Sequence, residues 1–217
     1  MYETIIEELK KTDTQLIAVS KTKPNEAIME LYNKGQRRFG ENYVQELVEK
    51  NDALPKDIEW HFIGHLQTNK VKYIAPFVSM IHAVDSLKLL QEIDKQAFKN
   101  NRKIKCFLQF HIADEKSKFG FNTEGGVNSL NSEILTALKN VEICGVMGMA
   151  TFTDDKVQVR EEFKKMKQIF DILKRTYLMD NPLFQHISMG MSDDYKIAIE
   201  EGSTMVRIGS LLFGKRT

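Results

Sequence analysis

A lysine stands at the end of a short apolar segment near the start of the chain. Residues 16–20 read Leu-Ile-Ala-Val-Ser and predict a buried strand, which ends before Pro24. An ammonium group held beside an apolar wall loses hydration, which lowers its pKa and leaves some of the lysine neutral and nucleophilic. Lys21 is therefore a candidate for Schiff-base chemistry with a carbonyl compound. On this segment alone, a lysine that simply reaches water is the favoured alternative.

Two segments near the C-terminus end in small and hydroxyl-bearing residues. Residues 188–192 read Ser-Met-Gly-Met-Ser, and residues 205–210 read Met-Val-Arg-Ile-Gly-Ser. Loops of this kind after late strands of an α/β barrel commonly bind phosphate, and a glycine lets the backbone approach the anion. We therefore predict a phosphate site at these two strand ends. Glycines that serve only to form turns are the competing explanation.

Arg207 lies two residues before Gly209, so the two share one face of the expected strand. In a barrel that face is the interior, and a guanidinium there needs hydrogen-bond acceptors or a negative charge. Two roles remain open from the sequence. Arg207 either contacts a ligand or forms a structural ion pair with an acid of the barrel.

The histidines do not have the spacing of a metal site. His61 and His65 are four residues apart, but across a strand end, so they cannot share a face as two zinc ligands on a helix do. His82, His111 and His186 fall in other expected strands, where buried hydrogen bonds are the expected role. No metal site is predicted.

The overall composition is that of an ordinary globular protein. Among 217 residues, 31 are basic and 30 acidic, giving a net charge of +1, and 42% are hydrophobic. No basic stripe indicates nucleic-acid binding, and no apolar run is long enough to span a membrane. Residues 1–14 lack the pattern of a signal peptide, and Cys106 and Cys144 are expected to be reduced and buried. We expect a cytoplasmic protein.

Strand-like and helix-like patterns alternate along the chain from residue 16 onward. The expected strands are 16–20, 37–40, 58–64, 78–84, 104–112, 141–150, 186–189 and 204–209. The expected helices are 25–35, 43–50, 69–75, 87–99, 131–138, a segment around 163–173, and 195–201, with a polar loop at 113–126. The segment around 163–173 has the clearest amphipathic period.

Eight strands that alternate with helices predict a parallel (β/α)8 barrel, a TIM barrel, with residues 1–217 as one domain and 1–14 as a helix packed on it. An open doubly wound sheet is the alternative, but no strand is followed by G-x-G-x-x-G. Chemistry in such barrels occurs where the strands end. The polar residues that follow expected strands are Lys21, Glu41, Asn42, His65, Gln67, Asp85, Lys116, Lys118, Thr151, Ser192, Gly209 and Ser210.

Five motifs occur in an order that resembles a known family. They are Ala18-Val19-Ser20-Lys21-Thr22-Lys23-Pro24, the segment 39–46 (Phe-Gly-Glu-Asn-Tyr-Val-Gln-Glu), the segment 60–70 (Trp-His-Phe-Ile-Gly-His-Leu-Gln-Thr-Asn-Lys), the segment 188–194 and the segment 202–209. Together they resemble the pyridoxal phosphate homeostasis proteins, single-domain relatives of the alanine racemase N-terminal barrel. The resemblance covers nearly the whole chain.

The resemblance implies a set of cofactor contacts. Lys21 would form a Schiff base with pyridoxal 5'-phosphate (PLP), and Arg207 would face the pyridine nitrogen of the cofactor. The other implied contacts are Asn42 near the ring and Ser192, Gly209 and Ser210 at the phosphate. Ser210 replaces a threonine that is frequent in the family, and the hydroxyl is kept.

The resemblance also implies a function in intracellular PLP homeostasis, with the cofactor bound, buffered and delivered and with little or no turnover. An arginine leaves the ring nitrogen unprotonated, which weakens the cofactor as an electron sink. Racemases of this fold add a β-rich domain, for which a chain ending at Thr217 has no room. Apo forms of PLP enzymes are the candidate acceptors, and a monomer is expected.

Two enzymatic alternatives remain open. One is a PLP-dependent amino-acid racemase or lyase that takes its acid and base from His65 or Lys118 at the barrel mouth. The other is an aldolase that attaches sugar phosphates to Lys21, since it would use the same barrel, lysine and phosphate loop. A further hypothesis gives Lys116 or Lys118 a part in passing the cofactor on by transimination.

Overall fold

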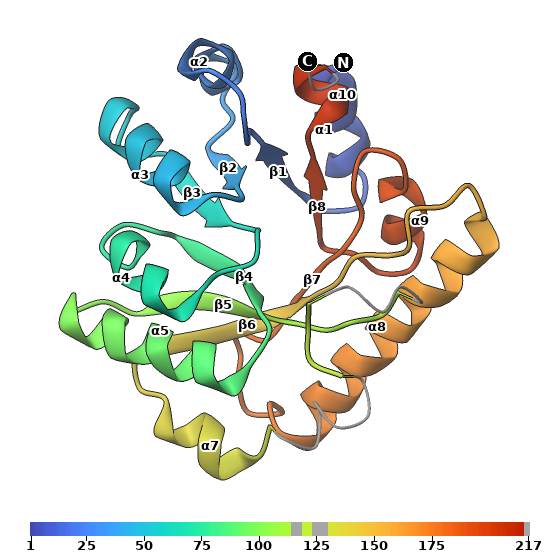
Figure 1. Ribbon diagram of the computed structural model, residues 1–217. Coiled ribbons are helices and arrows are strands. Elements are labelled where there is room, and N and C mark those ends of the chain that lie inside the picture. Colours follow the sequence, from blue (N-terminus) through green and yellow to red (C-terminus); the bar gives the residue numbers. More distant parts are fainter. Residues whose placement is uncertain (114–118, 123–129, 215–217) are drawn as a thin grey trace.

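The computed structural model shows a closed barrel of eight parallel strands with helices around its outside (Figure 1). The structure describes residues 1–113, 119–122 and 130–214. Each strand pairs with the next along the chain, and β8 closes the barrel on β1, with Ile17 opposite Arg207. The predicted TIM barrel is thus confirmed.

The strands are β1 (Gln15–Val19), β2 (Arg38–Glu41), β3 (Glu59–Phe62), β4 (Met80–Val84), β5 (Ile104–Gln109), β6 (Val141–Met147), β7 (His186–Ser188) and β8 (Met205–Ile208). The helices are α1 (Tyr2–Lys10), α2 (Asn25–Asn33), α3 (Val44–Ala53), the short 3-10 turn η1 (Thr68–Lys70), α4 (Val71–Ile74), α5 (Leu87–Lys99), α7 (Ser132–Ala137), α8 (Lys156–Thr176), α9 (Tyr195–Glu200) and α10 (Ser210–Phe213).

Each predicted strand overlaps an observed strand, but three of the predictions extend too far. Segments 58–64, 104–112 and 141–150 run past the ends of β3, β5 and β6. The apolar pattern continues there because the loop residues are themselves covered: Ile112 is buried in the core, and Ile63 and Met149 line a cavity. The single helix expected at 69–75 is instead η1 followed by α4.

Two layers of apolar side chains hold the barrel. The larger layer lies between the strands and the surrounding helices, and it includes Trp60, Phe163 and Phe184. The smaller fills the barrel interior and comprises Ile17, Met80, Ala83, Phe107, Cys144, Met147 and Met205. Cys106 and Cys144 are free and buried, and burial raises the pKa of both thiols.

Helix α1 packs on the outside of the seam where the barrel closes. Ile5 and Leu9 of α1 are buried against Leu16 of β1 and against Val206 and Ile208 of β8. The α1 helix therefore covers apolar side chains at the β1–β8 junction, beside the two strands that carry Lys21 and Arg207.

Over the part of the chain that is described, no helix combines the length and the apolar character that crossing a membrane requires.

Candidate functional site

A cavity of about 270 Å³ lies at the C-terminal ends of the strands. All six predicted site residues line it: Lys21, Asn42, Ser192, Arg207, Gly209 and Ser210. Val19, Lys23, Ile63, Met149, Phe152, Met191, Asp193 and Gly214 complete the lining. The structure thus brings together residues from both ends of the sequence at the face where barrel chemistry is found.

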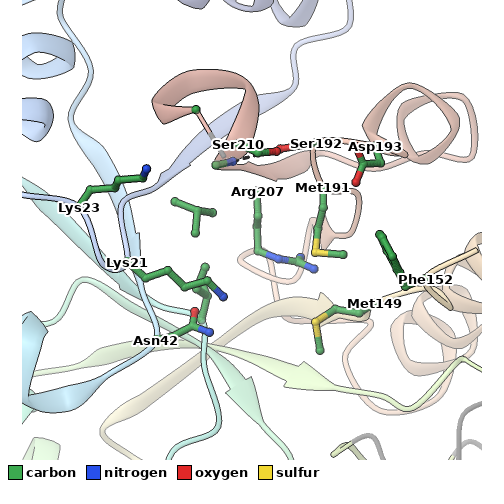
Figure 2. A pocket seen from close by; sticks show the side chains of 14 residues that line it. Lys21, Lys23, Asn42, Met149, Phe152, Met191, Ser192, Asp193, Arg207 and Ser210 are labelled. Carbon is green, nitrogen blue, oxygen red and sulfur yellow. Dashed lines mark hydrogen bonds between the residues drawn. The ribbon is translucent and has the colours of Figure 1, made fainter. Parts of the chain in front are cut away.

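Lys21 follows directly on β1 and extends into this cavity (Figure 2). Figure 2 shows Lys21 and Asn42 on one side of the cavity and Arg207 across from them. The next residue, Thr22, has a φ of 63°, a left-handed conformation that is unusual for a β-branched side chain. The chain therefore turns sharply after Lys21, and the contacts around that turn must hold it.

A buried polar network holds the residue before Lys21. The Ser20 hydroxyl donates to Glu41 Oε1 at 2.6 Å, and Lys50 Nζ donates to the same oxygen and to the Ser20 carbonyl, both at 2.8 Å. Glu41 is fully buried and Lys50 of α3 nearly so. Burial raises the Glu41 pKa to about 7, although Lys50 and Ser20 oppose that rise.

The residue after Lys21 is held by the same helix. The Thr22 backbone N–H donates to Glu46 Oε1 at 2.6 Å, and Lys50 Nζ also reaches that oxygen at 2.6 Å. Lys50 thus joins two carboxylates that contact either side of Lys21. We call Ser20, Glu41, Glu46 and Lys50 the strand-end clamp, because these side chains fix the backbone from which Lys21 projects.

Arg207 is buried in the barrel and bonds to neutral acceptors. One terminal nitrogen, Nη1, donates to the Ser188 carbonyl at 2.8 Å and to the Ser188 hydroxyl at 2.7 Å, and Nη2 donates to the Gly148 carbonyl at 3.0 Å. Within the described residues Arg207 has no ion pair, so the structural ion pair is not its role. Burial lowers its pKa to about 10, with nearby Asp194 opposing, and the guanidinium stays charged at neutral pH.

The loops after β7 and β8 meet at one end of the cavity. Ser192 Oγ accepts a hydrogen bond from the Gly209 backbone N–H at 3.3 Å. A Cβ at Gly209 would lie 3.2 Å from the Val19 carbonyl oxygen, closer than β1 and β8 comfortably allow. Gly190 has a φ of 93°, and a Cβ there would lie 2.6 Å from the Ala198 Cβ. Both glycines are needed where the two loops approach their neighbours.

Asp194 holds the turn that carries Ser192. Its Oδ1 accepts the Met191 backbone N–H at 2.5 Å, and burial raises the Asp194 pKa. Figure 2 shows Ser192 beside Ser210, the first residue of α10, with Asp193 on the far side of Ser192. Two loops distant in sequence thus present a hydroxyl pair and a glycine to the same end of the cavity.

A chain of hydrogen bonds crosses the barrel interior below Arg207. His82 Nδ1 lies 3.0 Å from the Ser188 hydroxyl, and His82 Nε2 lies 2.8 Å from His61 Nδ1. Burial lowers the pKa of both histidines, that of His61 to about 3, so both rings are neutral. Sequence reasoning expected a buried hydrogen bond for His82 but did not connect it to Arg207, because that link joins residues from three strands.

The remaining histidines behave differently. His186 Nδ1 contacts the Thr204 hydroxyl at 3.3 Å, as expected for a histidine in a strand. His111 Nε2 is buried with no hydrogen-bond partner among the described residues, which contradicts the expectation for that atom. Groups of three or more His, Cys, Asp or Glu side chains suited to a metal ion do not occur in the described parts of the chain.

Of the acid–base candidates of the racemase alternative, His65 does not line the cavity that holds Lys21. His65 Nδ1 lies 3.0 Å from the Asp85 carboxylate, and its ring stacks on Phe119 with centroids 3.8 Å apart. His65 lines a neighbouring hollow between α3 and α4 rather than the cavity that holds Lys21. Lys116 and Lys118 lie outside the described residues.

The chain is similar in sequence and in fold to known proteins. Residues 2–217 match the family model described as the N-terminal domain of alanine racemase. A pyridoxal phosphate homeostasis protein from Aquifex aeolicus is 44% identical over 203 residues, which span 93% of this chain and 87% of that protein. The solved structure of PipY from Synechococcus elongatus with PLP bound is 34% identical, covers 96% of this chain and 98% of its own, and has a TM-score of 0.84. The solved structure of PipY without PLP has a TM-score of 0.87.

Proposed function

The chain belongs to the alanine racemase N-terminal domain family and, within it, to the pyridoxal phosphate homeostasis proteins, and from that membership we propose that it binds PLP and maintains the supply of this cofactor. The observation that carries the proposal is the cavity at the barrel mouth. There a strand-end lysine, a charged arginine and a hydroxyl- and glycine-bearing pair of loops line one space.

The residues in the cavity fit the three chemical parts of PLP. Lys21 supplies a primary amine for the aldehyde carbon. Three of the five N–H groups of Arg207 are used by Ser188 and Gly148, which leaves its Nε and one Nη2 hydrogen to donate to the ring nitrogen. The hydroxyls of Ser192 and Ser210 and the backbone at Gly209 suit a phosphate.

When bound, PLP supplies an aldehyde for imine formation and a ring that withdraws electrons from attached substrates. Arg207 limits this electron withdrawal by the ring, because its guanidinium stays protonated and offers only hydrogen-bond donors. A pyridine nitrogen opposite it must accept a hydrogen bond and remain unprotonated. We therefore propose a holding role with little or no turnover, in which Lys21 anchors the cofactor and Arg207 keeps its ring weakly activated.

Several finer features belong to the same proposal. We place the protein in the cytoplasm as a monomer, and we propose apo forms of PLP enzymes as the acceptors of its cofactor. The even charge balance, with 31 basic and 30 acidic residues, fits recognition of a small cofactor rather than of a polyanion.

The decisive experiment is borohydride reduction of the protein with PLP, followed by peptide mass spectrometry. We expect a phosphopyridoxyl group on Lys21. The aldolase alternative predicts instead that a sugar-phosphate carbon chain is trapped on Lys21 when sugar phosphates are supplied. Absence of any adduct at Lys21 after incubation with PLP would reject the proposal.

Ser192→Ala tests the phosphate end of the cavity. It removes one hydroxyl and the acceptor of the Gly209 N–H, so we expect the Kd for PLP to rise about tenfold, as the loss of one hydrogen bond to a charged group implies. Pyridoxal, which lacks the phosphate, serves as the control ligand, and its Kd should change little. Equal losses for both ligands in a fluorescence titration would place Ser192 away from the phosphate.

A further inference from the structure

A second cavity, of about 280 Å³, lies at the opposite end of the barrel. Its lining includes residues near the starts of five strands: Gln15, Arg38, Glu59, Lys105 and His186. His61, Cys144 and Met205 from the barrel interior also line it. It shares no residue with the cavity that holds Lys21. We call it the lower cavity.

Two cations at the lower cavity have unused donors. Arg38 contacts Glu59 through Nε at 3.2 Å, and its two terminal nitrogens make no hydrogen bond to a described residue. Lys105, which also lines this cavity, makes no ion pair or hydrogen bond through its side chain within the described residues. Burial is the main cause that lowers the pKa of His61 and of His186, and the positive potential of Arg38 and Lys105 lowers both further.

The series of hydrogen bonds in the barrel interior points to a third donor at the lower cavity, the Nε2–H group of His61. The Ser188 hydroxyl accepts from Arg207, which can only donate, and we assign its own hydrogen to His82 Nδ1, its other partner among the described residues. His82 then carries its proton on Nε2 and donates to His61 Nδ1. It follows that the neutral ring of His61 carries its proton on Nε2.

That last N–H has no acceptor. His61 Nε2 is buried and has no partner among the described residues, whereas His61 Nδ1 and both ring nitrogens of His82 are hydrogen-bonded. His61 lines the lower cavity, whereas His82, which holds the opposite edge of the ring, does not. A buried donor without an acceptor is costly, and the residue that carries it is one of those lining the lower cavity.

We propose that the lower cavity binds a small oxyanion, held by Arg38, Lys105 and the Nε2–H of His61. An anion supplies the acceptor that His61 lacks. It also supplies negative charge, because Arg38 and Lys105 carry two positive charges and Glu59 offsets only one of them. Phosphate and carboxylate groups share this chemistry, and Arg38 offers the paired terminal nitrogens that bind either in a bidentate manner. Anion binding in the lower cavity is independent of PLP binding at the other end, because the two cavities share no lining residue.

The test is titration of the purified protein with inorganic phosphate and, separately, with acetate, observing the His61 ring nitrogens by two-dimensional NMR. Sodium chloride at matched ionic strength is the control. We expect a saturable shift of the His61 Nε2 resonance with phosphate, acetate or both, which also identifies the preferred anion. No saturable shift with either one, or the same shift with chloride, overturns the proposal.

Arg38→Gln and Lys105→Gln add a matched test. Both replace side chains outside the core, so the fold should persist, as circular dichroism can verify. Each should weaken anion binding about tenfold or more, whereas Lys164→Gln on the exposed face of α8 should leave it unchanged. Equal affinity in all three variants would show that the shift at His61 arises elsewhere. The measured resonance belongs to His61, which lines the lower cavity and not the cavity that holds Lys21. Anion binding can therefore be measured even if the protein does not bind PLP.

Discussion

Lys21→Ala is expected to abolish covalent attachment of PLP, so that the purified variant loses the visible absorption of the wild-type complex. Lys21 is the lysine that follows directly on β1 and extends into the cavity opposite Arg207. Without its amine, PLP keeps only the contacts to ring and phosphate, and we expect its Kd to rise at least a hundredfold. Absorption spectra before and after gel filtration measure both effects.

Two further variants separate the imine from other effects of Lys21. Lys21→Arg keeps the positive charge but cannot form an imine, and it should lose the absorption as completely as alanine does. Lys23 lines the same cavity and donates to the Phe213 carbonyl at 3.1 Å, so Lys23→Ala tests whether a neighbouring lysine is attached instead. A colourless Lys23→Ala protein alongside a coloured Lys21→Ala protein would reassign the attachment site.

The barrel and the membership of the cavity could be predicted from sequence because both depend on local signals. Apolar runs alternating with amphipathic helices imply parallel pairing, and parallel pairing brings all strand ends to one face. Lys21, Ser192 and Gly209 each lie within a few residues of such an end, so their meeting in one cavity follows from chain order.

The clamp and the partners of Arg207 could not be predicted in the same way. Glu41 was grouped with the polar residues at the barrel mouth, yet it alternates with Gly40 and is buried facing α3, where it meets Lys50. Arg207 was expected to need hydrogen-bond acceptors or a negative charge, but the sequence did not indicate which acceptors, and they are the Ser188 hydroxyl and two backbone carbonyls. Both outcomes depend on register between strands and helices, which local patterns do not encode.

The titration of Glu41 gives the clamp a recognisable pH signature. Its pKa is about 7 in the folded protein against the ordinary glutamate value of 4.5, so between these values the folded chain binds more protons than the unfolded chain. The contribution of Glu41 to the free energy of unfolding is therefore greatest below pH 4.5 and is lost as the pH rises towards 7. Glu41→Gln should remove that dependence, and urea unfolding of both proteins across this range measures the difference.

Lys50→Met is expected to destabilise the protein by about 3 kcal/mol or more at pH 8, because it leaves the ionised Glu41 buried without its counter-charge. At pH 5 the loss should be smaller, since Glu41 is then protonated. Lys164→Met removes an exposed ion pair with Glu161 and should cost less than about 0.5 kcal/mol at either pH. Similar losses for the two lysines, or a loss for Lys50→Met that does not vary with pH, would contradict the role assigned to Lys50.

The double variant Glu41→Gln/Lys50→Met distinguishes stability from the positioning of Lys21. Removing both charges eliminates the uncompensated carboxylate, so part of the lost stability should return. The Ser20 carbonyl still lacks the donor that Lys50 provided at 2.8 Å, and Glu46 loses the ammonium that holds it against Thr22. We therefore expect PLP affinity to stay about tenfold below that of the wild type even where the fold is restored. Full recovery of affinity together with stability would show that the clamp supports the fold alone and does not orient Lys21.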